Sequence, residues 1–245
     1  MHAAPCPVAL APARRSPHSV AVRMMAAGVM DAVSRVLARR WIDAIVLSAA
    51  IQTAATTLVI ILGRMLSAGD SASAVFNAIF LSLAAVITAV ATAFFGFLTG
   101  QVFERKLPAF PLRSWIAINV LLGLVYGPLI GLGAMMPTES DANPWTSASL
   151  AAGYLIMGAI VNAVEGSVQA LILRKVAYGA GTWIAYCALA GACWLLVIPD
   201  IAGIPRELTS TATGFLQILV MGLIVLPAML RLRPRDRHTI PMLFE

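Results

Sequence analysis

Residues 150–173 read LAAGYLIMGAIVNAVEGSVQALIL, an apolar run with a single charged side chain, Glu165. The hydrocarbon core of a bilayer is about 30 Å thick, and about 20 apolar residues in a helix cross it. Only helices and closed barrels satisfy their backbone hydrogen bonds in lipid, and a continuous run without alternation favours a helix. The run ends at Arg174 and Lys175. This stretch therefore predicts a transmembrane helix.

Five further runs of this kind lie on either side of it, at residues 41–63, 75–100, 115–136, 183–199 and 212–230. Polar segments that carry proline or glycine separate them, as expected for loops. Apolar residues make up 60% of the chain and charged residues 11%, whereas a soluble domain has about 25% charged residues. Lipid must therefore cover most of the exterior. We predict an all-α polytopic bundle of six transmembrane helices over residues 41–230.

The basic residues lie almost entirely on one side of these predicted helices. Fifteen of the 17 Lys and Arg residues fall in the N-terminal segment, in the loops after the second and fourth helices, and in the C-terminal tail. Only Arg64 and Arg206 lie on the other side. Because cytoplasmic loops are enriched in Lys and Arg, both termini are predicted to be cytoplasmic. The same rule explains the net charge of +6 without a nucleic-acid partner.

The two ends of the chain form separate segments. Residues 1–19 hold four prolines and are expected to be disordered, and residues 20–40 are expected to form an amphipathic helix on the membrane surface. Residues 231–245 form a basic cytoplasmic tail. We expect the bacterial inner membrane. The mitochondrial inner membrane is the alternative, because an Arg-rich, acid-poor start also fits a presequence.

A weak internal repeat relates the loops that enter the third and fifth helices. Gln101, Lys106, residues 114–117 (SWIA) and Gly123 recur 68 residues later as Gln169, Arg174, residues 182–185 (TWIA) and Gly191, and Trp41-Ile42 followed by Ala49 is a fainter copy. Trp also favours membrane interfaces and basic residues favour cytoplasmic loops, so chance stays an alternative to duplication. A real duplication would relate the hairpins by an axis along the membrane normal.

Glu165 is the sharpest candidate for a functional residue. It precedes Arg174 by nine residues, which places it ~13 Å inside the helix, near the middle of the bilayer. An acid at the centre of a transmembrane helix costs roughly 2.5–3.5 kcal/mol, so its side chain is predicted to face the bundle interior. No Lys, Arg or His lies in any predicted span. Glu165 therefore either carries a proton or meets water or a cationic ligand.

Other polar residues are predicted to line a cavity with Glu165. Asn162 and Gln169 share its helix face. Gln52 lies at a similar depth in the first span, and Asn119 lies at the depth of Gln169. The predicted ligand-binding set is thus Gln52, Asn119, Asn162, Glu165 and Gln169. In the alternative, these side chains only hydrogen-bond between helices and Glu165 is neutral.

The third predicted helix carries a stripe of small residues, Gly123, Gly127 and Gly131, which follow Asn119 at intervals of four. Such a stripe lets a second helix approach closely, within the bundle or across a dimer. A matching stripe in the second span has Ala84, Thr88, Thr92, Gly96 and Gly100. We predict a packing role for these glycines.

No known catalytic pattern is present in the chain. The spans hold no histidine, and H-E-x-x-H, G-x-S-x-G and phosphate-loop motifs are missing. The only cysteines are Cys6, Cys187 and Cys193, without the spacing of a metal site or a disulfide framework. We therefore expect no enzyme activity, no metal and no cofactor.

The leading hypothesis is a membrane subunit that transports or binds a small molecule. Six spans with cytoplasmic termini, and Ala50 and Ala54 four apart in the first span, resemble the substrate-binding subunits of energy-coupling-factor vitamin transporters. The resemblance covers topology and one spacing, and implies that a small-residue face of the first helix contacts a coupling subunit. It assigns no substrate residue. The alternative is an interaction, assembly or sensor protein whose glycine faces bind other helices. Expected partners are the lipid bilayer and a second copy or partner membrane subunit.

Overall fold

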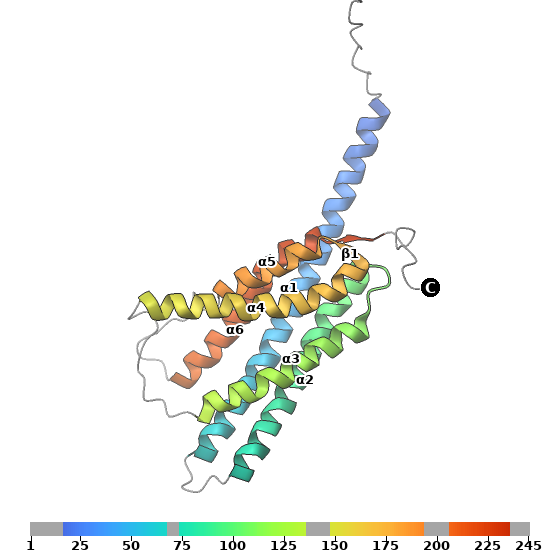
Figure 1. Ribbon diagram of the computed structural model, residues 1–245. Coiled ribbons are helices and arrows are strands. Elements are labelled where there is room, and N and C mark those ends of the chain that lie inside the picture. Colours follow the sequence, from blue (N-terminus) through green and yellow to red (C-terminus); the bar gives the residue numbers. More distant parts are fainter. Residues whose placement is uncertain (1–16, 68–73, 136–147, 194–205, 236–245) are drawn as a thin grey trace, which may run out of the picture. The chain divides into compact units, whose positions relative to one another are not determined.

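The computed structural model describes residues 17–67, 74–135, 148–193 and 206–235 (Figure 1). The chain divides into two compact units, Met1–Val36 and Leu37–Glu245. Among the described residues every long element is a helix, and two short strands pair with each other. In chain order the elements are α1 (Pro17–Ser67), α2 (Ala74–Lys106), α3 (Leu112–Met135), α4 (Ala148–Val176), β1 (Ala177–Tyr178), α5 (Ala180–Ala192), α6 (Arg206–Arg231) and β2 (Arg233–Pro234).

Five of these helices are long and apolar enough to cross a membrane. The apolar stretches are Ala32–Leu66, Ala74–Lys106, Leu112–Leu132, Leu155–Val176 and Ala212–Arg231. Helix α5 is apolar but has 13 residues, and the end of its predicted span, beyond Cys193, lies outside the described residues. On α4, Ile156, Ile160 and Val164 are exposed. Because such surfaces need lipid as their solvent, the protein is a multi-pass membrane protein.

The predicted terminal segments fall partly outside the described residues. Residues 1–16 and 236–245, and with them the expected disorder and most of the basic tail, are not described. The predicted helix over residues 20–40 is part of α1, which begins at Pro17. A proline at the first helical position is favourable because its missing N–H would have no partner there.

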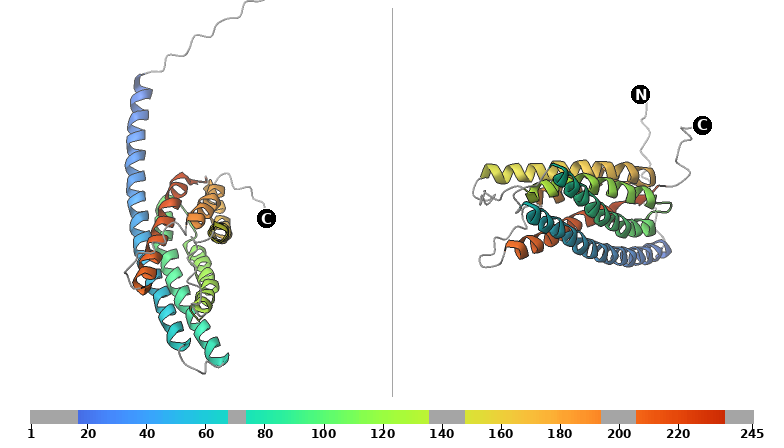
Figure 2. Two further views of the ribbon diagram at one scale, coloured as in Figure 1. Left: turned by 90° about the vertical axis from the view of Figure 1, so that its left-hand side faces the viewer. Right: turned by 90° about the horizontal axis from the view of Figure 1, so that it is seen from below.

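The helices of the second unit pair into hairpins. Figures 1 and 2 show α2 beside α3 and α4 beside α5. Gly179 precedes α5 with φ of +88°, a left-handed conformation that glycine adopts without strain. It allows the chain to turn from α4 into α5 within a few residues.

The small-residue stripe of α3 packs against α2 within the same chain. A Cβ atom added to Gly127 would lie 2.5 Å from the Ala84 carbonyl oxygen and from Ala85 Cα, and one added to Gly123 would meet Thr92 and the backbone of Thr88. Gly131 faces Ala84 and Leu81. These glycines bring the two helix backbones close together, as small residues do at helix interfaces in membranes.

The same glycine contact occurs in three helix pairs. Gly96 on α2 faces Asn119 on α3, Gly166 on α4 faces Cys187 on α5, and Gly222 on α6 faces Ile45 on α1. In each pair, the contacted residue comes four positions after a tryptophan: Trp115, Trp183 or Trp41. Helices α6 and α1 therefore form a third pair of the same kind. We call this pair a hairpin as well, although the two helices are not consecutive in the chain.

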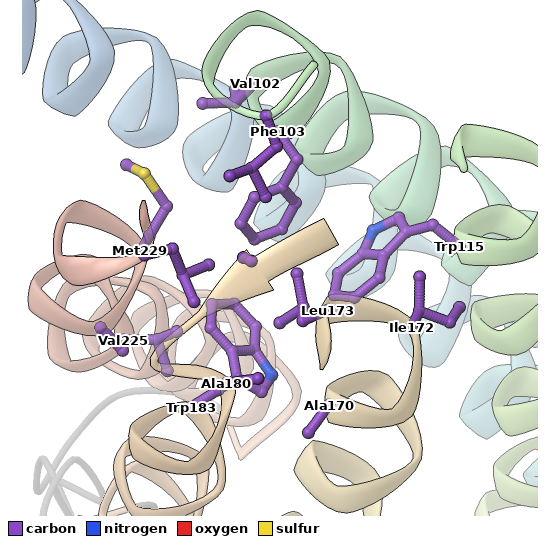
Figure 3. Close-up of a cluster of buried hydrophobic side chains, with 14 of the residues drawn as sticks. Val102, Phe103, Trp115, Ala170, Ile172, Leu173, Ala180, Trp183, Val225 and Met229 are labelled. Carbon is purple, nitrogen blue, oxygen red and sulfur yellow. The ribbon is translucent and has the colours of Figure 1, made fainter. Parts of the chain in front are cut away.

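The three hairpins meet in one hydrophobic core (Figure 3). The residues seven positions after the three glycines are Phe103, Leu173 and Met229, and all are fully buried. Around them lie the aromatic rings of Trp41, Trp115 and Trp183. The Phe103 ring contacts all three indoles, with centroids 5.1–5.7 Å apart. Edge-to-face pairs at such distances add to the stabilisation from burial.

The contacts correct the register of the sequence repeat. A spacing of 68 relates α3 to α5, for example Gly123 to Gly191, but the glycine contacts relate α2 to α4 at a spacing of 70. Gln101 is exposed whereas Gln169 is buried, so these two glutamines do not occupy like environments. At a spacing of 70, Gln169 corresponds to Thr99, which is also buried. The physical reason is the turn: 12 residues separate Phe103 from Trp115 (115−103), and 10 separate Leu173 from Trp183 (183−173).

The basic segments after α2, α4 and α6 lie together at one end of the bundle. Lys106 Nζ donates to the Met229 and Leu230 carbonyl oxygens at 2.5 and 2.6 Å, which satisfies two carbonyls in the last turn of α6. Strand β1 pairs antiparallel with β2, with Tyr178 opposite Arg233. The charge asymmetry of the sequence thus corresponds to one end of the folded unit.

Candidate functional site

The candidate site lies where α3 faces α4. Glu165 and Gln169 are one turn apart on α4, and Asn119 and Tyr126 are two turns apart on α3. Spacings of four and seven place residues on one helix face. The structure brings these four side chains into a single hydrogen-bonded group, which links the hairpin α2–α3 to the hairpin α4–α5.

Both carboxylate oxygens of Glu165 accept hydrogen bonds. Gln169 Nε2 donates to Oε1 at 3.2 Å, and the Tyr126 hydroxyl lies 3.4 Å from Oε2. The second distance exceeds the about 2.5–3.0 Å usual for a hydroxyl donor, so Tyr126 holds the carboxyl group weakly. Glu165 is itself partly exposed. Its oxygens therefore keep capacity for a further donor.

Trp183 fixes which way the Gln169 amide points. Its indole Nε1, which can only donate, is 3.0 Å from Gln169 Oε1. The amide nitrogen is thereby turned toward Glu165 and toward Asn119 Oδ1, which lies 3.5 Å away. Asn119 in turn donates through Nδ2 to the Trp115 carbonyl oxygen at 2.8 Å. The Trp183 and Gln169 donors thus point from the aromatic core toward the acid, whereas the Asn119 amide donates to the backbone of its own helix.

The group is mostly withdrawn from solvent and has no internal cation. Asn119 and Gln169 are 2% and 3% exposed. Within the four described ranges, Glu165 has no Lys, Arg or His partner; its two neighbours are the hydroxyl and the amide above. A carboxyl group with two donors and no described cation beside it can accept a further, charged donor. Such a group can bind a cation or exchange a proton.

Two of the predicted ligand-binding residues lie elsewhere. Asn162 Nδ2 bonds the Gly158 carbonyl of its own helix at 3.0 Å, and its side chain packs against Gly191. It serves the α4–α5 contact. Gln52 lies on α1, eleven residues after Trp41, as Tyr126 lies eleven after Trp115. It is therefore at a matching depth on a different helix, and the described hydrogen bonds do not join it to Glu165.

Tyr126 and Trp183 belong to the site but were not among the predicted residues. The sequence holds a signal for Tyr126, because it follows Asn119 by seven residues on the same helix face. Trp183 carries no such signal, since a tryptophan near a helix end is typical of any membrane interface. Its role depends on the packing of α5 against α4.

In the part of the chain that the structure describes, no three His, Cys, Asp or Glu side chains lie close enough together to hold a metal ion. The Cys187 side chain packs against Gly166, so it is a contact residue between α4 and α5.

Comparisons with other proteins add no relative. No family model matches the chain, and no curated protein or solved structure is significantly similar to it.

Proposed function

We propose that this protein binds a small, positively charged molecule at Glu165, as a transport or ligand-binding subunit of a membrane. The observation that carries the proposal is the carboxyl group that receives two donors within a membrane-spanning helix and has no cation beside it among the described residues. We propose a role in holding and moving a ligand rather than in catalysis.

The chemistry of the group favours a cation over an anion or a neutral ligand. The polar side chains at the site are one acid, one hydroxyl and two amides. An anion would meet the Glu165 charge where little water screens it, which is costly. A ligand with an ammonium or guanidinium group supplies the missing donor and charge. The aromatic ring of Tyr126 offers a further attractive surface for such a cation.

The membrane placement extends this proposal. We infer six spans, with α5 continuing beyond its described residues, and cytoplasmic termini in a bacterial inner membrane. The gathering of the basic ends supports this orientation, because the cytoplasmic side attracts Lys and Arg. A mitochondrial inner membrane would fit the same arrangement.

We further infer that the bundle consists of three related hairpins around one axis, α2–α3, α4–α5 and α6–α1. The equivalent glycines and the buried Phe103, Leu173 and Met229 support the inference. Glu165 comes directly before Gly166. The residues directly before Gly96 and Gly222 are Phe95 and Met221. The acid therefore occurs in one hairpin alone, and we expect one ligand site per chain.

The alternative, an interaction protein that binds other helices through glycine faces, has less support. Gly123, Gly127 and Gly131 are already packed on α2 and offer no free face to a partner. Ala50 and Ala54 on α1 are exposed. A partner subunit would find a small-residue face there, and such a partner is compatible with ligand binding.

The test is ligand binding by the full chain in lipid nanodiscs. Native mass spectrometry reports any retained molecule, and thermal unfolding is then measured with methylammonium, tetramethylammonium and guanidinium as probes. A cation at 100 times its dissociation constant stabilises the folded protein by about 2.7 kcal/mol. We expect this shift for the wild type and for Glu104→Gln, which changes an exposed acid at the end of α2.

Glu165→Gln should unfold at the wild-type temperature without ligand and lose the shift. The proposal fails if Glu165→Gln responds to cations as the wild type does. It also fails if neither a retained molecule nor any of the three probes binds the wild type.

A further inference from the structure

A groove between α1 and α2 has an arginine, a polar residue and a leucine on each of its two walls. Arg40, Asp43 and Leu47 line it from α1, and Arg105, Gln101 and Leu98 line it from α2. Each set spans two helical turns, about 10 Å. Trp41 of α1 contacts Phe103 of α2, so the helices run antiparallel and the two arginines lie at the same end.

The groove is therefore graded from charged to apolar. The arginines stand at the basic end of the bundle, and the leucines stand toward its middle. The groove has a volume of about 250 Å³ and is more open than enclosed. The Leu47 side chain is 51% exposed, so the apolar end of the groove opens onto the lipid-facing surface.

At the equivalent place between α5 and α6, the arginine has a partner within the protein. Arg231 Nη1 donates to the hydroxyl of Tyr186, three residues after Trp183, at 2.9 Å, and its guanidinium lies 5.7 Å from the centre of the Tyr186 ring. Arg231 comes nine residues after Gly222, as Arg105 comes nine after Gly96. The residue three positions after Trp41 is Ala44, which also lines the α1–α2 pocket. The methyl group of Ala44 thus stands where α5 has the phenol of Tyr186. This leaves a space in the groove, and Arg105 lacks the hydroxyl acceptor that Arg231 has.

The polar and charged side chains of this groove are exposed and unpaired among the described residues. Arg40, Asp43, Gln101 and Arg105 are all exposed, and the described side chains supply no ion pair or hydrogen bond to them. Two guanidinium groups favour a phosphate, since their paired N–H donors match its oxygens. Asp43 would repel a bare phosphate but accepts a hydrogen bond from a donor next to it.

We propose that this groove binds a phospholipid of the leaflet at the basic end of the bundle. Arg40 and Arg105 hold the phosphodiester, Asp43 accepts from a hydroxyl or ammonium group of the headgroup, and an acyl chain lies over Leu47 and Leu98. This site is separate from Glu165 and does not depend on the proposed function. The graded groove favours a lipid over a soluble phosphate, because only a lipid covers both its charged and its apolar end.

The test is native mass spectrometry of the full chain in detergent, titrated with phosphatidylglycerol, phosphatidylethanolamine and phosphatidylcholine of identical acyl chains. The double variant Arg40→Gln/Arg105→Gln should bind phosphatidylglycerol about thirtyfold more weakly. The control Arg39→Gln/Arg113→Gln removes the same charge from exposed positions outside the groove and should stay within about threefold of the wild type. Arg40→Lys/Arg105→Lys keeps both charges and should retain most of the binding.

Asp43→Asn should remove the preference for the two donor-bearing lipids over phosphatidylcholine. The proposal is overturned if both arginine-to-glutamine pairs weaken binding equally, because the effect would then be general attraction. It is also overturned if millimolar inorganic phosphate displaces the lipid, which would indicate a soluble anion, or if the wild type binds all three lipids equally. Unfolding temperatures of the variants verify that each one is folded.

Discussion

Substituting alanine for Gly127 tests a close approach of two helix backbones, those of α2 and α3. The added Cβ would lie 2.5 Å from the Ala84 carbonyl oxygen and from Ala85 Cα, whereas ordinary contacts begin at 3.4 Å. The α2 and α3 backbones must therefore separate by 0.9 Å (3.4−2.5) at this point. Overpacking of this kind costs about 1–3 kcal/mol.

The matched control is Gly153→Ala on α4, where a Cβ meets nothing within 4 Å. Alanine is favoured over glycine in both helices by about 0.5–1 kcal/mol, so this contribution cancels in the comparison. The difference between the two variants should thus be about 1–3 kcal/mol in the free energy of unfolding. Because the opposing atoms belong to the α2 backbone, the second-site change Ala85→Gly should not restore the loss.

The measurement is reversible unfolding in mixed micelles of dodecylmaltoside and dodecyl sulfate, followed by tryptophan fluorescence. Trp115 and Trp183 are almost fully buried, so their emission reports the loss of the core. If Gly127→Ala and Gly153→Ala unfold at the same dodecyl sulfate fraction, α2 and α3 do not pack at this glycine and the described hairpin is refuted.

Three further predictions follow from contacts of the core and from the charge pattern. Trp183→Phe keeps a smaller aromatic ring and removes the indole N–H that orients Gln169; the lost bond alone should cost about 0.6–1.7 kcal/mol of stability, and cation binding should weaken. Trp115→Phe makes the same reduction in ring size but removes a bond to Thr99 and should spare binding, so equal binding by both variants would contradict the orienting role. Lys106→Met removes two bonds to carbonyls of α6 and should destabilise by about 1–3 kcal/mol, seen as faster amide exchange in the last turn of α6, whereas the exposed Lys175→Met should leave that exchange unchanged. Cysteines placed at Pro108 and Tyr178, in a background without native cysteines, should react with an impermeant maleimide only from the cytoplasmic side, and labelling from the opposite side would reverse the proposed topology.

The existence of the helices follows from composition, and the details of the site follow from packing. Runs without charge predict helices because lipid leaves few other structures possible, and the stripe on α3 predicts close contact wherever a second helix meets it. The position of Glu165 on one face with Gln169 was visible for the same reason. The orientation of the Gln169 amide was not predictable, since it depends on Trp183 from a helix that packs alongside.

The pairing of α6 with α1 could not be predicted from the order of the helices in the chain. Gly222 of α6 and Trp41 of α1 are joined by a hydrogen bond of 2.9 Å, yet 181 residues separate them. The buried counterparts Phe103, Leu173 and Met229 differ in identity, because a core position specifies size and apolarity more than residue type.

The hairpin of α6 with α1 has a consequence for how the protein is made. Among the described helices, α1 is synthesised first and its partner α6 is synthesised last. Two of its buried hydroxyls, on Ser48 and Thr53, have no hydrogen-bond acceptor among the described residues, and Thr53 lies near Gly214 of α6. During translation this polar face of α1 stays uncovered until α6 has been made. We expect insertion factors that shield nascent segments to cover it for longer than the other described helices. The pairing of α6 with α1 then follows the synthesis of the other described helices.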